Sequence, residues 1–116
     1  MNNSRKFSLQ IQFEPGAKAD PGLIDNVVDV VKQEGGRVTG VSVSEEGGEP
    51  FATVNVETQD ANAFWRKAKP KLTTTPRSKL LKGMIIVCEG EDGWNDYLLL
   101  HHFDKTQEID ALRVTR

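Results

Sequence analysis

The chain has 116 residues, of which 37% are hydrophobic and 28% are charged, and its net charge is −2. This length suits one domain, and the nearly neutral charge excludes a general attraction to nucleic acid or to an anionic membrane. No apolar run approaches the ~18 residues that span a bilayer. Residues 1–6 do not lead into the apolar core of a signal peptide, and a single cysteine, Cys88, excludes an internal disulfide. We therefore expect one cytoplasmic domain over residues 1–116, without membrane contact.

The first third of the chain predicts a strand and a helix. Apolar and polar side chains alternate from Phe7 to Phe13, which is the period of a strand with one buried face. Asp20 and Pro21 then open a helix, with Asp20 as the N-cap and Pro21 at the first position, where its missing N–H has no partner to lose. Gly35-Gly36 ends this helix, as in a left-handed C-terminal cap. The expected buried stripe of the helix consists of Leu23, Ile24, Val27, Val28 and Val31.

The middle of the chain predicts a β-hairpin and a second helix. Residues 37–44 and 51–58 read as strands, and Gly47-Gly48 between them supplies the turn. Asp60 is a second N-cap, and Pro70 is expected to end or kink the helix that Asp60 opens. The expected buried stripe of this helix consists of Ala61, Phe64, Trp65, Ala68 and Leu72.

The last third predicts two more strands and a short helix. Residues 83–89 contain a continuous apolar run, which is typical of a strand covered on both faces. Residues 96–103 alternate as a strand, with a helix as the alternative. Asp104 and Gln107 have the spacing of a capping box, which predicts a short final helix containing Ile109.

The order of these elements predicts an α+β fold. A ferredoxin-like split βαβ plait (βαββαβ) follows when two right-handed βαβ units share one sheet. We expect an added C-terminal strand and short helix, with the two longer helices on one face of a mostly antiparallel sheet. The core would span residues 7–89 and the C-terminal extension residues 94–116.

Residues 7–72 resemble the ACT regulatory domain. The resemblance rests on the strand 7–13, on the helix opening Asp20-Pro21-Gly22-Leu23-Ile24 and on the helix exit Gly35-Gly36-Arg37-Val38. It implies a pocket for an amino acid or another small molecule near Asp20, Gly22 and Leu23, completed by a partner subunit. The long loop before Asp20 and the C-terminal third of the chain depart from that family's pattern.

His101 and His102 are the only histidines, so imidazole chemistry would have to use them. Adjacent side chains of a strand point to opposite faces, so the pair is poorly placed to hold one metal ion. One histidine with Asp96 or Asp104 could form a general base and its orienting acid. The alternative is that both histidines are structural or surface residues.

The segment from residue 66 to residue 82 holds seven cations and no acid. With the hydroxyls of residues 73–75, these cations could bind a small anion or an acidic partner protein. The expected contact residues are Lys69, Lys71, Arg77 and Lys79, together with Trp94 in a polar turn. The alternatives are a solvated helix face for the cations and a packing role for the indole.

Two other groups predict no chemistry. Glu89, Glu91, Asp92 and Asp96 lie around a Gly-rich turn, but their spacing differs from that of a calcium loop, so we expect a solvated turn and no metal. Cys88 lies inside an apolar run without an activating neighbour, which favours a buried thiol.

The sequence therefore predicts a non-enzymatic binding or interaction module without a cofactor. We expect it to pair with a second copy through its sheet, or to take an acidic protein or small anionic ligand. The sheet lacks the aromatic pair with which plaits bind RNA, which argues against nucleic acid. The alternative function is a small enzyme that uses His101 or His102 with Asp96 or Asp104 as acid and base.

Overall fold

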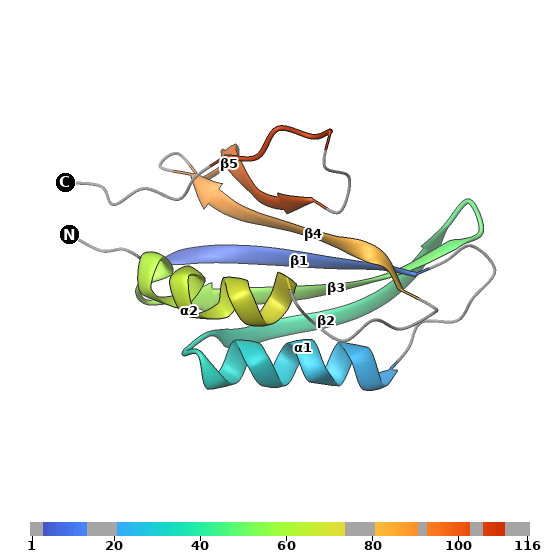
Figure 1. Cartoon of the computed structure of the whole chain (residues 1–116), viewed down its shortest axis with the longest axis horizontal. Coiled ribbons are helices and arrows are strands. Elements are labelled where there is room, and N and C mark those ends of the chain that lie inside the picture. The colour runs from blue at the N-terminus through green and yellow to red at the C-terminus, as the bar shows by residue number, and fades with distance from the viewer. Residues whose placement is uncertain (1–3, 14–20, 74–80, 91–92, 103–105, 111–116) are drawn as a thin grey trace.

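The computed structural model of the chain describes residues 4–13, 21–73, 81–90, 93–102 and 106–110 (Figure 1). In chain order the elements are β1 (Arg5–Phe13), α1 (Pro21–Gln33), β2 (Arg37–Glu46), β3 (Glu49–Thr58), α2 (Ala61–Thr73), β4 (Leu81–Gly90) and β5 (Gly93–His102). Neither described helix is both long and apolar enough to cross a membrane.

The five strands form one sheet in the order β2-β3-β1-β4-β5, with β1 at the centre. Every neighbouring pair is antiparallel. The alternation predicted for β1 is confirmed, because Phe7, Leu9, Ile11 and Phe13 are all buried. Phe7 lies opposite Val56 on one side and Cys88 on the other, so one face of the three central strands forms the floor of the core.

The two helices begin and end largely where local chemistry predicts. The amide of Ala63 donates to the Asp60 carboxylate at 3.1 Å, which confirms the N-cap of α2. Gly35 adopts φ +92°, the left-handed conformation expected after α1. Pro70 does not end α2, which continues to Thr73; the burial of Leu72 holds the last turn on the core. Asp20 lies outside the described residues.

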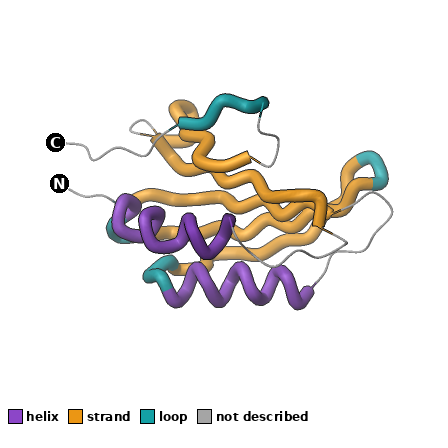
Figure 2. Tube along the Cα trace, viewed as in Figure 1, coloured by secondary structure: helices purple, strands orange, loops and turns teal. Residues whose placement is uncertain are grey.

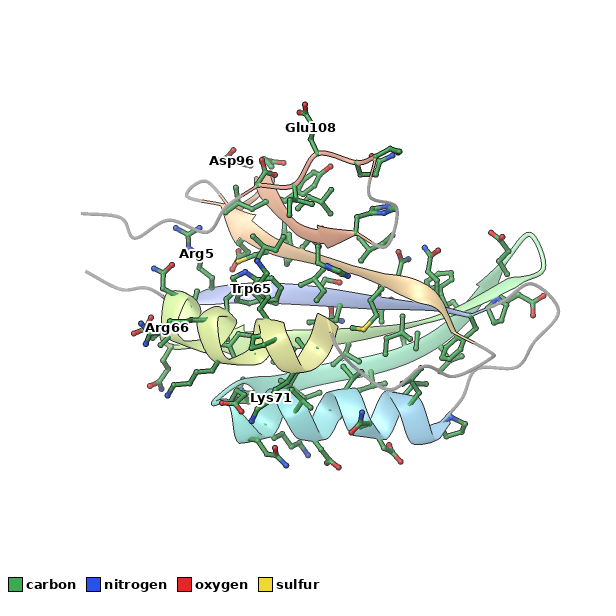
Figure 3. The ribbon with its side chains drawn as sticks, in the orientation of Figure 1. Arg5, Trp65, Arg66, Lys71, Asp96 and Glu108 are labelled. Atoms are coloured by element: carbon green, nitrogen blue, oxygen red, sulfur yellow. The ribbon has the colours of Figure 1, made fainter. Side chains whose placement is uncertain are left out.

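Side chains from both helices meet at the sheet. The ring of Phe7 contacts Phe64 edge to face with 5.1 Å between centroids, and Trp65 lies 6.2 Å away. Figure 3 shows Trp65 on the side of α2 that faces β1. A Cβ on Gly36 would lie within 3 Å of Val31, Phe64 and Val56, so only glycine fits where α1, α2 and β3 converge.

The predicted fold class, a ferredoxin-like plait with both helices packed on one face of a mostly antiparallel sheet, is wrong. The structure is instead a five-stranded antiparallel sheet with two helices, in the strand order β2-β3-β1-β4-β5. Helix α1 contacts α2, β2 and β3, whereas β5 lies at the far margin of the sheet (Figure 1). The order of elements along a chain does not determine which strands pair, and the β4–β5 hairpin extends the sheet beyond the helices.

The C-terminal segment also differs from the prediction. Residues 93–102 form a strand, as expected for 96–103 as far as they are described, but residues 106–110 form no helix. Instead, the Asp110 amide donates to the Leu99 carbonyl at 2.7 Å, and the Leu99 amide donates to the Asp110 carboxylate at 2.9 Å. We call these two bonds the Asp110 clasp. These bonds satisfy backbone groups of β5 that an edge strand would otherwise leave exposed. The stabilisation that they provide outweighs the tendency of the capping box at Asp104 and Gln107 to start a helix.

Candidate functional site

A groove with a volume of about 280 Å³ opens beside the sheet. Its polar lining faces away from the helices, because Lys6 and Glu57 alternate with the buried residues Phe7 and Val56. Four strands contribute to it: β1, β2, β3 and β5. The lining residues, which together we call the Trp94 groove, are Lys6, Phe7, Thr39, Asn55, Val56, Glu57 and Trp94.

Charges of both signs lie along this groove. Lys6 and Glu57 are directly opposite each other in the β1–β3 register. The Arg37 guanidinium lies 3.9 Å from the Glu57 carboxylate, with both side chains exposed. On β2, the Thr39 hydroxyl donates to the Asn55 carbonyl at 3.3 Å, which steadies the β2 side of the groove. The groove therefore presents an ammonium group, a carboxylate and a side-chain amide within one small volume.

The indole of Trp94 completes the groove from the far side of β4. Gly93 adopts φ +81°, and the backbone of Asp96 passes so close to Gly90 that a Cβ there would lie 1.8 Å from the Asp96 carbonyl oxygen. This tight crossing sets the path of β5 at its start, where Trp94 follows. The side chain keeps 44% of its surface exposed, which leaves a ring face for contact.

The start of β1 is tied to the end of β4 at the same end of the sheet. The Lys6 amide donates to the Glu89 carboxylate at 2.7 Å. The Arg5 guanidinium, labelled in Figure 3, donates to the Glu89 carbonyl at 3.0 Å. Glu89 thus serves as an anchor for the strand that carries Lys6, and not as the solvated turn residue that the sequence suggested.

The predicted acid–base residues are not brought together in the described part of the chain. Asp96 is exposed near the β4–β5 turn, and His101 lies five residues further along β5, roughly 15 Å away at the rise of a strand. His101 and His102 are both half-buried, and they lie opposite Ile86 and Ile85. Burial is the largest cause that lowers the pKa of His101, and the charges of His102 and Lys69 lower it further. Asp104 lies outside the described residues.

The lowered pKa of His101 predicts a pH dependence of stability. Below its usual value of 6.5, the unfolded chain binds this proton more readily than the folded chain. The free energy of unfolding should therefore fall as the pH is lowered from 6.5 toward 5 and should not depend on this group above 6.5. Urea unfolding across this range should give a flatter curve for His101→Gln than for the parent.

His102→Gln is the matched control for that measurement. It should keep most of the slope, because burial, the first cause of the shift at His101, remains. An equal slope in the parent and in His101→Gln would contradict the assignment.

Helix α2 carries four of the seven cations of the basic segment, and Lys82 lies at the start of β4. Arg66, Lys67, Lys69 and Lys71 are all exposed. The Lys71 ammonium pairs with the Glu34 carboxylate, just beyond the end of α1, and Figure 3 shows Lys71 on the α1 side of α2. Lys71 thus links the two helices. Arg77 and Lys79 lie outside the described residues, so two of the five predicted contact residues are not placed.

The remaining predicted residues that the structure describes lie outside the groove lining. Leu23 is buried in the core, Gly22 is exposed on the first turn of α1, and Asp20 is not described. Cys88 is buried, and burial raises the pKa of its thiol to about 12, so its thiolate is scarce at neutral pH. Among the described residues, no three potential His, Cys, Asp or Glu ligands gather as a metal site would require.

Sequence reasoning singled out Trp94 but missed Lys6, Thr39, Asn55 and Glu57. Each of these four appears in the sequence as an ordinary polar residue on the solvent side of a strand. Only the pairing of β3 with β1 and β2 brings them together: Lys6 and Glu57 are 51 positions apart, and Thr39 and Asn55 are 16 positions apart. The alternating pattern could have assigned them to one face, but not to one groove.

Comparisons of the chain with protein-family models, with curated proteins and with solved structures found no match.

Proposed function

We propose that this chain is a non-enzymatic binding module, and that the Trp94 groove holds a small zwitterion of the amino-acid class. The observation that carries the proposal is the grouping of Lys6, Glu57 and Trp94 in one groove. An ammonium and a carboxylate side by side complement a ligand that carries both opposite charges. The exposed indole offers a flat apolar surface for the rest of that ligand.

Among the described residues, the arrangement of charges leaves one cation of the groove without an ion-pair partner. Within the part of the chain that the structure describes, Glu57 pairs with Arg37 rather than with Lys6. The Lys6 ammonium is therefore available to a ligand carboxylate, and Glu57 can accept from a ligand ammonium. The volume of about 280 Å³ suits a molecule of amino-acid size, since pockets for drug-sized ligands typically begin near that value.

Two features support binding over catalysis. Asp96 lies far from His101 along β5, so Asp96 cannot orient His101 as a general base. Cys88, the one cysteine, is buried with a raised pKa and is unsuited to nucleophilic attack.

Fluorescence titration with the standard amino acids tests this proposal. Trp65 is buried and Trp94 exposed, so a ligand in the groove should change mainly the emission of Trp94. Replacing Lys6 with methionine should weaken binding about tenfold or more, because a hydrogen bond to a charged group contributes roughly 1.5–3 kcal/mol. Trp94→Phe should remove the emission change, and calorimetry should then report any remaining affinity.

Tyr97→Phe is the matched control, since Tyr97 is an exposed aromatic residue of β5 outside the groove lining. It should bind as the parent does. Binding that is unchanged in Lys6→Met and in Trp94→Ala would remove the groove as the site. The absence of saturable binding by any amino acid would remove this ligand class.

A further inference from the structure

We propose that the Trp94 groove prefers amino acids with an aromatic side chain, whose ring stacks on the indole of Trp94. This inference rests on the proposed function and deepens it, because it names the ligand within the amino-acid class. Three features of the groove carry it: the few charged side chains in its lining, the side on which the indole lies, and the exposed surface of that indole.

Two charged side chains, Lys6 and Glu57, belong to the groove lining, and the other lining residues are uncharged. The proposed function assigns these two charges to the carboxylate and the ammonium of the ligand. A charged group on the ligand side chain would therefore enter the groove without an opposite charge in the lining, which is unfavourable. Arg37 lies outside the lining and already pairs with Glu57. The groove therefore favours an uncharged ligand side chain.

The charged groups and the indole lie on different sides of the groove. In the strand order β3-β1-β4-β5, Glu57 lies on β3, Lys6 on β1 and Trp94 on β5. A ligand that donates its ammonium to Glu57 and offers its carboxylate to Lys6 has its side chain left to contact the rest of the lining. Phe7 and Val56 are buried in the core, so Trp94 supplies the large exposed apolar side chain of the lining. The ligand side chain therefore lies against the indole.

The backbone that carries the indole is constrained, and its ring is accessible. The close crossing of β4 and β5 at Gly90 sets the path of the chain near Trp94. The groove is lined by strand residues, and Figure 2 shows both described helices well away from the start of β5. The indole keeps 44% of its surface exposed. A side chain that is positioned before the ligand arrives loses little freedom on binding, which strengthens the contact.

An aromatic ligand gains more from this contact than an aliphatic ligand of the same size. Two aromatic rings attract each other beyond the effect of their buried area, because offset and edge-to-face arrangements bring opposite partial charges together. An aliphatic side chain lacks this additional attraction. The favoured ligands are thus phenylalanine, tyrosine and tryptophan as free amino acids.

Calorimetric titration of the full chain with phenylalanine and with cyclohexylalanine tests the preference. The two ligands have the same charged groups and the same carbon skeleton, and only phenylalanine has an aromatic ring. Phenylalanine should bind about three- to tenfold more tightly, the factor that corresponds to the usual gain of an aromatic pair. Aspartate and lysine should bind more weakly than either ligand.

Variants of Trp94 assign the preference to the indole. Trp94→Leu keeps an apolar side chain without a ring, so it should bind phenylalanine and cyclohexylalanine with similar affinity. Trp94→Phe keeps a ring and should retain the preference for phenylalanine. Tyr97→Leu is the matched control, since it removes an exposed aromatic residue of β5 outside the groove lining, and it should retain the preference in full.

The outcomes separate this inference from the proposed function. Equal binding of phenylalanine and cyclohexylalanine by the parent, with affinity still lost in Lys6→Met, would overturn the aromatic preference and leave the amino-acid site in place. Binding of aspartate or lysine as tight as that of phenylalanine would also overturn the preference, and so would an unchanged preference in Trp94→Leu. A lack of saturable binding by any amino acid would remove the proposed function together with this inference.

Discussion

Replacing Gly90 with alanine is expected to lower the free energy of unfolding by about 3 kcal/mol or more, the upper end of the usual cost of overpacking. The added Cβ would lie 1.8 Å from the Asp96 carbonyl oxygen and 2.8 Å from its carbonyl carbon. These are backbone atoms, so the clash cannot be relieved by turning a side chain. The strand β5 must shift, and Trp94 must shift with it. Urea unfolding at a protein concentration where the chain is monomeric measures the loss.

Gly40→Ala is the control for this substitution. A Cβ on Gly40 would meet only the Asn55 side chain, at the ordinary contact distance of 3.8 Å. Its effect should stay within about 0.5 kcal/mol, as for most surface substitutions. If the two alanine variants lost similar amounts of stability, the close crossing of β4 and β5 at Gly90 would be wrong.

Replacing Phe7 with alanine should cost about 3–5 kcal/mol, the usual range for a buried aromatic residue. The ring is buried, contacts Phe64 and lies close to Trp65, so its removal leaves a cavity between the sheet and α2. Most domains have only about 5–15 kcal/mol of stability, so this variant should be close to unfolding. Phe7→Leu, which keeps most of the volume, allows a measurement by urea unfolding even where alanine does not.

Phe51→Ala provides a comparison of the same chemical change on the other face. Phe51 is half-buried on β3 and lies opposite Gln12 in the β1–β3 register, away from the helices. Its loss should cost less than half as much as the loss of Phe7. Equal costs would mean that the core does not lie on the Phe7 face of the sheet.

The local elements of this chain were predictable because their signals are local. The alternation from Phe7 to Phe13 describes a strand with one buried face without reference to any other segment. Asp60 caps α2 through an amide three residues away, which is also a short-range interaction. Such features depend on a few consecutive residues, so the sequence contains all the information they need.

The overall arrangement was not predictable in the same way. The fold class was wrong because it was inferred from element order, which says little about how far β5 extends the sheet past the helices. The final helix was wrong because its capping signal competes with the unpaired backbone of β5, which no local pattern shows. The groove was missed because Lys6, Thr39 and Glu57 become neighbours only through strand register.

The Asp110 clasp has a consequence for the size of any assembly that this chain forms. A sheet with two open margins can add one copy at each, and each addition leaves a new open margin, so growth has no natural end. A sheet with one margin occupied stops at two copies. One carboxylate and one amide, both from Asp110, engage Leu99 at that margin. At Leu99, Asp110 therefore occupies the backbone groups that an added strand would use, which hinders growth of the sheet at that margin.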